Sequence, residues 1–532
     1  MSVHRVVGLE TEYGVLAPST PGASSTLLSA QVVNAYAATI RSGYGHLAGT
    51  RWDYTDETPL SDARGFNQPR ALAHPSQLTD EPRELTAAEI ALAGGDARAG
   101  DTLYAEEEPE EHVLMNMVLG NGARLYVDHA HPEYSSPETT NPADAVLWDQ
   151  AGDRVVLAAA RRIEQSPGFA PVLLYKNNTD NKSVSYGAHE NYLMPRSVPF
   201  GDIAAGLIPF FATRQVFCGS GRVGRGSMGS AAGFQVSQRA DFFEAEVGLE
   251  TTIRRPIVNT RDEPHAVWDK YRRLHVIIGD ANMGQVSTYL RTGTTALVLS
   301  LIEAGSVPDL ALRHPVAALQ AISHDPTLRT TVELLDGRRL RAIDIQRVYL
   351  EAARTHCAAT GADDPMTADV LERWGSTLDT LSSDVFGAAS SVDWVAKYQL
   401  MQGYRDRHGL GWNDARIGLM DLQWADIRPE KGLYHRLAAR GMMETLWSEE
   451  QIAHAVSHPP EDTRAYFRGR ALSQYPEDVV AASWDAVLFS VPGRAGVQRV
   501  ATLEPQRGTR ALVGELFDAS HSISEFLERL RA

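Results

Sequence analysis

Polar side chains two residues apart, set inside otherwise apolar segments, are the chemically most informative pattern in this sequence. In a β-strand, residues i and i+2 point to the same face of the sheet. Each such segment would therefore present its polar side chains together. The sets are Glu10 with Glu12, Arg124 with Tyr126 and Asp128, His189 with Asn191, and Arg273 with His275.

These residue types indicate a wet, charged concavity, because a sheet face lined by carboxylates, imidazoles and guanidinium groups would be costly to bury dry. Carboxylates with a few histidines and no thiolates suit Mg²⁺ or Mn²⁺, and Mg²⁺ commonly binds through carboxylates and phosphates together. The planar guanidinium groups of Arg124 and Arg273 match phosphate oxygens. Each set alone has a structural alternative, such as an edge-strand pair or a surface salt bridge. Their joint recurrence favours a site for metal and phosphate.

Other candidate motifs give weaker evidence for a functional site. Residues 219–224 fit the pattern GxGxxG, but the residues that follow cannot open a helix, so a flexible glycine loop is expected instead of a dinucleotide site. His129 and His131 flank a turn with no third ligand at zinc spacing, and we assign them structural roles. No GxSxG motif occurs, and neither Cys218 nor Cys357 lies beside a His-rich motif, which argues against serine or cysteine nucleophiles.

The elements that must position these side chains follow from hydrophobic periodicity. Strand-like segments dominate the first half of the chain and helical patterns the second half, which predicts an α+β layer structure. The expected strands cover residues 3–9, 123–130, 172–178, 189–194, 234–237, 256–260, 274–279, 483–491 and 497–503, and the expected helices cover 27–40, 143–165, 203–211, most of 287–455 and 512–530.

The chain has 532 residues, and a single core stops growing at about 250–300 residues, so at least two structural units are expected. We place a catalytic domain at residues 1–460 and a small C-terminal domain at 461–532. A long insertion at about 56–112 is rich in Pro, Gly and Asp. It contains an acidic run at 106–111 and at most one short helix, near 86–92.

The net charge of the chain limits the kinds of partner that it can bind. With 50 Lys and Arg against 67 Asp and Glu, the net charge is −17, which argues against a nucleic-acid binder. Fourteen acidic and four basic residues fall between Asp56 and His112, so this segment carries −10 and the remainder only −7. The longest apolar runs are far short of the ~18 residues of a membrane span. No secretion signal is recognisable and only two cysteines occur, so we expect a cytoplasmic protein without a membrane anchor.

Four long motifs, in order, resemble the Pup-processing enzymes, the family of Pup ligases and Pup deamidases. The resemblance covers almost the whole chain. The motifs are Gly-Leu-Glu-Thr-Glu-Tyr-Gly at 8–14, Asn-Gly-Ala-Arg-Leu-Tyr-Val-Asp at 121–128 followed by His-Pro-Glu-Tyr at 131–134, Ser-Tyr-Gly-Ala-His-Glu-Asn-Tyr at 185–192, and Asn-Thr-Arg-Asp-Glu-Pro-His at 259–265 leading to Tyr-Arg-Arg-Leu-His at 271–275.

The resemblance implies a glutamine-synthetase-like fold: a curved antiparallel sheet cradle backed by helices, a small C-terminal α/β domain, and bound ATP and Mg²⁺. It implies Asp128 as the catalytic residue. The implied metal positions are Glu10, Tyr126, Glu133, His189 and His275 with Glu12 as a neighbour, and the implied nucleotide contacts are Arg124, Ser136, Asn191, Arg273 and Trp484. For Trp484, the alternative to a nucleotide contact is a role as a core aromatic of the C-terminal domain.

Two features favour the deamidase and depupylase branch of this family over the ligase branch. One is the long insertion, preceded by Arg-Trp-Asp-Tyr at 51–54, and the other is the short connection after Asp128. The implied reaction is hydrolysis of a side-chain amide or isopeptide bond at the C-terminal residue of Pup, with Asp128 as nucleophile or as base for a water. A ligase that consumes ATP and a non-catalytic Pup-binding protein are the alternatives.

Pup and pupylated proteins are the implied partners, the proteasomal ATPase is a further candidate, and a monomer is expected. The insertion is predicted to regulate access to the site or to order catalytic groups.

Overall fold

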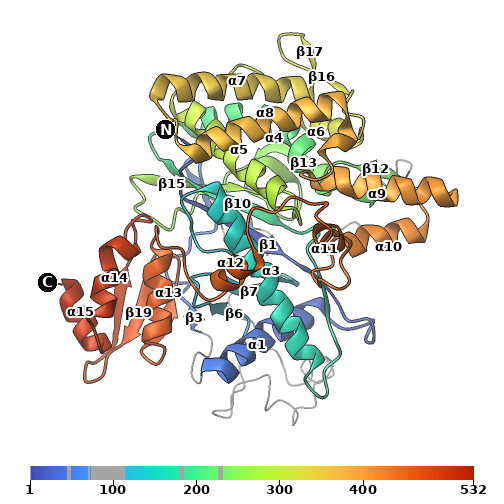
Figure 1. The fold of residues 1–532 in the computed structure, drawn as a ribbon. Coiled ribbons are helices and arrows are strands. Elements are labelled where there is room, and N and C mark those ends of the chain that lie inside the picture. Colours follow the sequence, from blue (N-terminus) through green and yellow to red (C-terminus); the bar gives the residue numbers. More distant parts are fainter. Residues whose placement is uncertain are drawn as a thin grey trace.

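A six-stranded antiparallel sheet forms the centre of the computed structural model (Figure 1), which describes residues 2–44, 50–69, 72–73, 114–179, 185–225 and 232–531. The strand order is β15-β10-β1-β8-β7-β6. Strands distant in sequence are therefore neighbours in the sheet. The strands are β1 (Val7–Glu12), β6 (Asn116–Val118), β7 (Arg124–Asp128), β8 (His131–Ser135), β10 (Ala188–Pro195) and β15 (Tyr271–Val276).

The register of this sheet puts the polar sets on one face. Glu10 lies opposite His189 on one side and Ser135 on the other, and Glu12 lies opposite Glu133. Directly opposed residues of antiparallel strands share a face. The prediction that the alternating polar residues of four strands would line one face is thereby confirmed.

The opposite face is mostly apolar, apart from buried polar groups such as Glu190, and packs on long helices. These are α1 (Ser25–Tyr44), α3 (Pro142–Glu164), α4 (Phe200–Cys218) and α5 (Gln285–Glu303). Leu9, Leu125 and Leu274 are buried there, at 2% exposure or less. Helix α3 begins where the sequence favours a start, since the Asn141 side chain accepts from Asp144 N (2.9 Å) and Pro142 occupies the first turn.

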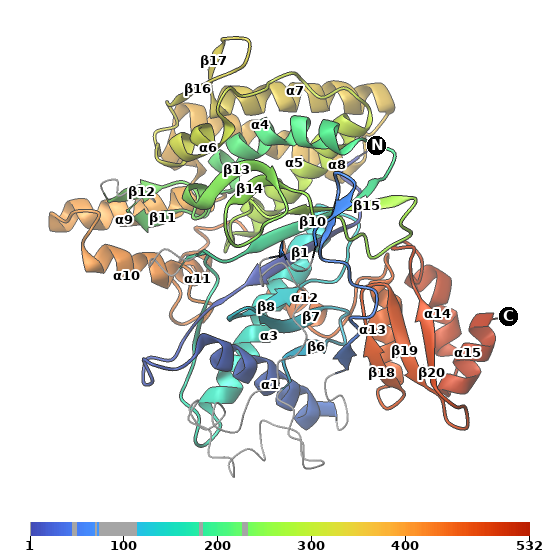
Figure 2. The ribbon, with the colours of Figure 1, turned by 180° about the vertical axis from the view of Figure 1, so that it is seen from behind.

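The second half of the chain is mostly helical, as predicted, and confirms the α+β class. Figures 1 and 2 show α4, α5, α7 and α8 stacked at one end of the sheet, with α9 and α10 projecting to one side. One hairpin, β16 (Thr331–Glu333) with β17 (Arg339–Arg341), interrupts the helices. The helices are α6 (Pro315–Ser323), α7 (Ala342–Thr360), α8 (Pro365–Ser383), α9 (Asp393–His408), α10 (Ala415–Trp424), α11 (Leu433–Ala438) and α12 (Glu449–Ala455).

The remaining short strands flank the central sheet. The parallel pair β13–β14 leads into the loop before β15. Their bounds are β2 (Gly14–Leu16), β9 (Leu173–Tyr175), β11 (Arg222–Gly224), β12 (Gly233–Gln235), β13 (Phe243–Gly248) and β14 (Arg255–Asn259).

The C-terminal unit has its own sheet and core (Figure 2). Its strand order is β20-β19-β18-β3, and β3 (Arg51–Trp52) pairs in parallel with β18. A segment from before the insertion thus completes this sheet, and Trp52 belongs to its core. The division of the chain at residue 460 stays a prediction. The other elements are α13 (Ala465–Gln474), β18 (Val479–Ala482), β19 (Ala486–Ser490), β20 (Val497–Ala501), α14 (Arg510–Asp518) and α15 (Ile523–Arg531).

Three expectations about elements were wrong. The first strand runs over Val7–Glu12 instead of 3–9, because Glu10 and Glu12 continue the ladder. The single helix expected at 512–530 is two helices, with a turn around the buried Ser520, whose Oγ donates to Leu516 O (2.8 Å). Residues 219–224 do not form the expected flexible loop. Ser220 is only 1% exposed, and residues 222–224 form strand β11.

Only the start of the insertion is described. Residues 56–69 contain the short hairpin β4 (Ser61–Asp62) and β5 (Phe66–Asn67). The acidic run at 106–111 and the short helix predicted near 86–92 lie outside the described residues.

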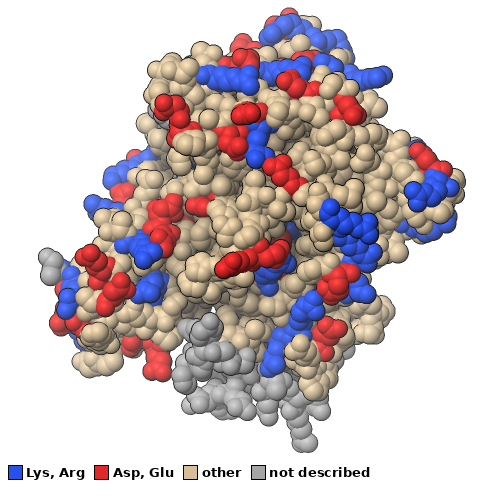
Figure 3. Space-filling view, viewed as in Figure 1, with Lys and Arg blue, Asp and Glu red and all other residues tan. Residues whose placement is uncertain are grey.

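Acidic and basic side chains are interspersed over the face of the molecule in Figure 3. None of the described helices combines the length and apolar character that crossing a membrane would require.

Candidate active site

The polar face of the sheet carries two groups of metal-ligating side chains. Glu10, His189 and His275 form the first group, with one ligand atom from each within 4.8 Å of the others. The Nδ1 atom of His189 lies 3.1 Å from Glu10 Oε2. Burial raises the pKa of Glu10, but the neighbouring His189 and His275 outweigh burial and hold that pKa below its usual value. Glu10 is therefore a carboxylate poised to share a cation with imidazoles.

The second group is Glu12, Asp128 and Glu133, whose ligand atoms also lie within 4.8 Å of one another. Three carboxylates this close repel one another, and burial followed by the charges of Asp128, Glu10 and Glu12 raises the pKa of Glu133 well above its usual value. A bound cation relieves such repulsion.

Orphaned polar atoms test whether these groups fit a divalent cation. Both carboxylate oxygens of Glu133 and both ring nitrogens of His275 are buried without a hydrogen bond to any described residue. Buried polar atoms are nearly always satisfied in folded proteins. The carboxylate oxygens of Glu12, Asp128 and Glu133 fit Mg²⁺ or Mn²⁺, so this group fits the metal that the sequence implies.

Asp128 ends β7 at the edge of this cluster. The Nδ1 atom of His129 lies 2.7 Å from Asp128 Oδ1, and the Asp128 side chain keeps 22% of its surface exposed. Burial raises the pKa of Asp128, but the hydrogen bond and charge of His129 outweigh burial and lower the pKa to about 2. Asp128 is thus ionised near neutral pH and open to a substrate.

Arg124 is held between aromatic rings on the same face. Its guanidinium carbon lies 4.1 Å from the ring centroid of Trp52 and 3.9 Å from that of Tyr126. Its Nε donates to Asn116 Oδ1 (3.0 Å). Because stacking and this hydrogen bond fix the plane of the guanidinium group, Arg124 presents a pre-oriented cation to the site.

A hydrogen-bonded chain crosses from β1 to β15. Asn191 Nδ2 donates to Glu10 Oε1 (2.8 Å), and Arg273 Nη1 donates to Asn191 Oδ1 (3.0 Å). Arg273 also lies 3.4 Å from Glu263 Oε2. Ser136 follows β8, where its Oγ accepts from Leu9 N (2.9 Å). These hydrogen bonds link Glu10 to the Arg273 cation, which faces both pockets described next.

Two adjoining pockets cover this face. One is mainly apolar and the other is lined by charged residues. A nucleotide would suit this division, with an apolar base beside polar phosphates. The apolar pocket includes Val6, Leu9, Ser136, Asn191, Pro264 and Pro505, the charged pocket includes Arg124, Tyr126, Asp128, Glu133, His189 and His275, and Glu10, Ser135, His265, Arg273 and Trp484 line both.

Trp484 comes from the C-terminal unit, and the insertion's first residues also reach the site. Glu57 and Pro59 line the charged pocket, and Trp52 Nε1 donates to Glu57 Oε1 (2.6 Å). Asp62 accepts from Thr260 Oγ1 (2.7 Å), which anchors this segment beside the loop before β15. The start of the insertion therefore forms part of the wall of the site.

All twelve predicted site residues lie at these two pockets or on the polar sheet face beneath them; their roles remain predictions. Sequence reasoning missed both histidines of the β7–β8 turn. His129 contacts Asp128, with a positive φ of 53° that the tight turn imposes. His131 Nδ1 lies 3.0 Å from Glu12 Oε2. The short turn after Asp128 could have indicated this placement, because residues of a tight hairpin turn stay close to the strand end that carries Asp128.

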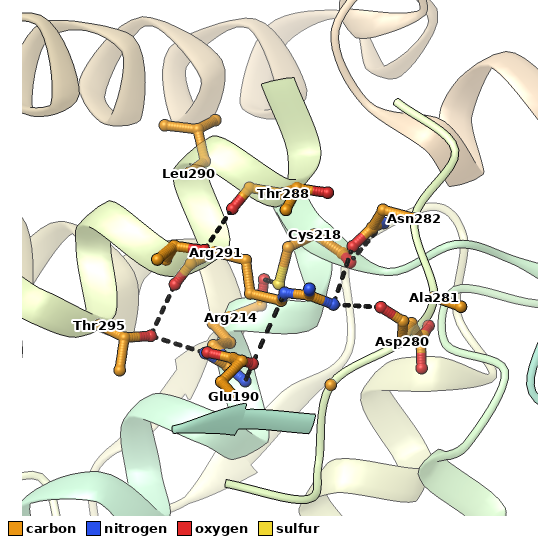
Figure 4. Close-up of polar contacts among 12 residues, drawn as sticks. Glu190, Arg214, Cys218, Asp280, Ala281, Asn282, Thr288, Leu290, Arg291 and Thr295 are labelled. Carbon is orange, nitrogen blue, oxygen red and sulfur yellow. Dashed lines mark hydrogen bonds and ion pairs between the residues drawn. The ribbon is translucent and has the colours of Figure 1, made fainter. Parts of the chain in front are cut away.

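Behind the sheet, the strands are held by buried ion networks. Figure 4 shows Glu190, which alternates with His189 and Asn191 along β10, pointing toward Arg214 and Arg291. Arg214 donates to both Glu190 oxygens (2.6 and 3.0 Å), and Arg291 Nε lies 3.6 Å from one of them. Behind β1, Lys176 lies 2.7 Å from Asp149 and 3.1 Å from Asp153, and these accept from Thr11 and Tyr13 (3.1 and 2.7 Å).

Comparison with known proteins matches the whole chain. Residues 5–488 match the family described as Pup-ligase protein. A depupylase of Acidothermus cellulolyticus is 54% identical over 532 residues, covering 99% of this chain and 99% of that protein. A Pup deamidase/depupylase of Mycobacterium tuberculosis is 51% identical over 535 residues, covering 100% of this chain and 99% of that protein.

Solved structures agree. The complex between Pup and its ligase PafA gives a TM-score of 0.74 at 30% identity and covers 99% of this chain and 94% of that chain. PafA in complex with ADP gives a TM-score of 0.68 at 33% identity, with 85% and 98% covered. The chain belongs to the Pup-ligase family.

Proposed function

We propose that this chain is a Pup deamidase and depupylase. It hydrolyses the side-chain amide of the C-terminal glutamine of Pup to glutamate and ammonia, and it hydrolyses the isopeptide bond between Pup and a substrate lysine. The observation that carries the proposal is full-length similarity, at 51–54% identity, to a depupylase and a Pup deamidase/depupylase. Ligases are less similar: two solved PafA chains are 30% and 33% identical, and a Pup–protein ligase of Rhodococcus erythropolis is 43% identical over 68% of this chain.

ATP with Mg²⁺ is the proposed cofactor. The apolar pocket adjoining a charged one supports a nucleotide, and a PafA structure holds ADP. Bound Mg²⁺ supplies charge neutralisation and polarises oxygens that it contacts. Arg124, Ser136, Asn191, Arg273 and Trp484 would contact the nucleotide, and Glu10, Glu12, Tyr126, Glu133, His189 and His275 would surround the metal.

Asp128 is the proposed catalytic residue, because it is ionised, partly exposed and at the edge of the metal cluster. Two roles fit this position. Its carboxylate attacks the amide carbon, and the nitrogen takes up a proton from water and leaves as ammonia or the lysine amine; water then cleaves the resulting anhydride, which releases the glutamate carboxylate and restores Asp128. Alternatively, it takes a proton from the water that attacks. Mass spectrometry of quenched reactions separates the two roles, since only direct attack leaves an adduct on Asp128.

A single assay tests the function against both alternatives. Glutamine-ended Pup is incubated with the enzyme, ATP and Mg²⁺, a parallel reaction contains glutamate-ended Pup and an acceptor protein, and ammonia, phosphate and conjugate are followed. Ammonia without matching phosphate supports the deamidase. Phosphate with a Pup conjugate of glutamate-ended Pup would instead indicate a ligase, and neither product would indicate a Pup-binding protein without activity.

The insertion is proposed to regulate access or order the catalytic groups, since Glu57 and Pro59 line the charged pocket. Deletion of residues 68–111 tests this, and unchanged deamidation, depupylation and ATP turnover would contradict it. A cytoplasmic monomer that acts on Pup and pupylated proteins, with the proteasomal ATPase as a further partner, completes the proposal.

A further inference from the structure

A partly buried carboxylate, Glu138, joins the C-terminal unit to the segment that follows β8; its side chain is 13% exposed and lines the apolar pocket. Glu138 accepts from Arg464 Nε (2.8 Å) and from Arg468 Nη2 (2.5 Å). Both arginines belong to the start of α13 and are at most 4% exposed. Thr463 Oγ1 also donates to Glu138 O (2.6 Å). The beginning of α13 is therefore fixed to one residue that lies two positions after Ser136.

The same arginines extend this contact to Trp484. Arg468 donates from Nη1 to Trp484 O (3.1 Å), and its guanidinium carbon lies 4.9 Å from the indole centroid. Arg468 Nε donates to Gly122 O (3.0 Å) in the turn before β7. Gly122 has a φ of +82°, and a Cβ there would lie 3.0 Å from Ala465 O, so α13 sits directly on this turn. One guanidinium group thus ties the central sheet, Glu138 and Trp484 together.

The position of Trp484 matters because its side chain lines both pockets. It is the residue of the C-terminal unit that the sequence predicts at the nucleotide. Arg464, for its part, donates from Nη1 to His265 O (2.5 Å) and Thr502 O (2.9 Å), which fixes the loop before β15 to the same unit. Three of the segments that line the apolar pocket are therefore tied together through Glu138 and its two arginines: the segment after β8, the C-terminal unit and the loop before β15.

We propose that Glu138 is a positioning residue for nucleotide binding, which acts through Arg468 to hold Trp484 over the apolar pocket. The inference rests on the proposed function for the identity of the ligand. Two arginines and a carboxylate are costly to bury, and replacement by apolar residues often stabilises a fold. Stability alone therefore does not explain this cluster. Its contacts fix a wall of the pocket, which is the effect that a positioning residue has.

The first test compares Glu138→Gln with Glu461→Gln in the full-length enzyme. Glu461 pairs with Arg510 at the surface of the same unit, where both side chains are about 60% exposed, so it is the matched control. Calorimetric titration with Mg-ADP is expected to show at least tenfold weaker binding for Glu138→Gln and unchanged binding for Glu461→Gln. The value of kcat at saturating ATP should stay within threefold of the wild type, while the KM for ATP rises. Unchanged ADP affinity in Glu138→Gln would overturn the proposal.

A double-mutant cycle separates positioning from direct contact. If Glu138 acts through Trp484, Glu138→Gln should weaken ADP binding much less in a Trp484→Ala background than in the wild type. Equal fold-losses in the two backgrounds would contradict the proposal, because Glu138 would then act independently of Trp484.

A second variant keeps the test open if Glu138→Gln does not fold. Arg468→Lys retains the positive charge but lacks the planar fork that reaches Glu138, Gly122 and Trp484 together. It should weaken ADP binding by a similar factor, and full affinity would again overturn the proposal. The two proposals fail separately: an enzyme that binds ADP but releases no ammonia from Pup contradicts the function, whereas the positioning role depends on ADP affinity alone.

Discussion

The charged side chains on the polar face of the central sheet and those around it differ in whether they have partners. The open face is the set of Glu10, Glu12, Asp128, Glu133, His189 and His275 on the polar side of the sheet. There, Glu133 and His275 have buried polar atoms without hydrogen bonds to the described residues. The closed networks are Glu190 with Arg214 and Arg291, Lys176 with Asp149 and Asp153, and Glu138 with Arg464 and Arg468.

This difference in partners indicates which charged residues could bind a ligand and which stabilise the sheet. A buried donor or acceptor without a partner costs about 1–3 kcal/mol, so a fold that keeps several of them at one place keeps them for a ligand. Each charge in the closed networks faces an opposite charge, although Arg291 Nε has no hydrogen bond to a described residue, and these ion pairs fix the backbone that carries the open face. Strand β10 carries both kinds, since His189 and Asn191 face the site while Glu190 between them faces the arginines.

Asp128→Asn is expected to give the largest effect. The amide has nearly the same shape but can neither attack a carbonyl nor accept a proton from water, so kcat for Pup deamidation should fall about 10⁴-fold, equivalent to about 5.5 kcal/mol. The melting temperature should fall only modestly, because the variant loses the contact between Asp128 and His129 at a partly exposed site. Ammonia release and calorimetry measure the two quantities.

Asp379→Asn is the control for this prediction, since its carboxylate is 76% exposed on α8. It should leave both quantities unchanged. Turnover by Asp128→Asn within tenfold of the wild type would remove Asp128 from the reaction in either proposed role.

Glu190→Gln should have the opposite signature. It leaves Arg214 and Arg291 buried beside a neutral group, and breaking a buried pair in this way typically costs about 3–5 kcal/mol. The loss should appear as a lower denaturant midpoint. Activity per folded molecule should fall far less than for Asp128→Asn.

Glu351→Gln on α7 provides the comparison, because Glu351 is 67% exposed and pairs with Arg354 on the same helix. Its effect should stay within about 0.5 kcal/mol. If Glu190→Gln were as mild as Glu351→Gln, the closed networks would not support the sheet.

The sequence predicted the open face better than the closed networks, for a physical reason. Alternation along a strand fixes which side chains share a face, so Glu10 could be paired with Glu12 and His189 with Asn191 from spacing, whereas their roles in one site were implied by the resemblance. Glu190 meets Arg214 and Arg291 only through the packing of β10 on α4 and α5. No local pattern records such a contact.

Short or continuous patterns misled the element predictions. The two residues of β3 are too few to show periodicity, so their place in the C-terminal sheet could not be read from the sequence. Residues 512–530 keep an amphipathic pattern through the turn that separates α14 from α15. The β7–β8 turn was recognised, but its closeness to Asp128 was not used, and His129 was therefore assigned a structural role.

The closed carboxylate Glu138 should respond to pH. Burial raises its pKa, but Arg468 and Arg464 outweigh burial and lower the pKa from 4.5 to about 2. A carboxylate with a depressed pKa in the folded state contributes stability above its unfolded pKa and loses it as pH falls. The difference in unfolding free energy between the wild type and Glu138→Gln should therefore shrink by about 3 kcal/mol as pH falls from 4.5 toward 2. Urea titrations at several pH values measure it, and a difference that does not vary with pH would contradict it.

Glu133→Gln tests the open face with the smallest expected effect on stability. Without metal, the variant removes one of three crowded carboxylates, and its new amide can donate to the two that remain. Its unfolding free energy should therefore equal or exceed that of the wild type by about 1 kcal/mol. Added Mg²⁺ should reverse the order, because ligand binding to the folded state stabilises the wild type by about 2.7 kcal/mol at a hundredfold excess over Kd, and the variant by less. Thermal unfolding with and without Mg²⁺ measures both. A variant that is clearly less stable without metal and gains as much from Mg²⁺ would place Glu133 among the supporting charges instead of the ligands.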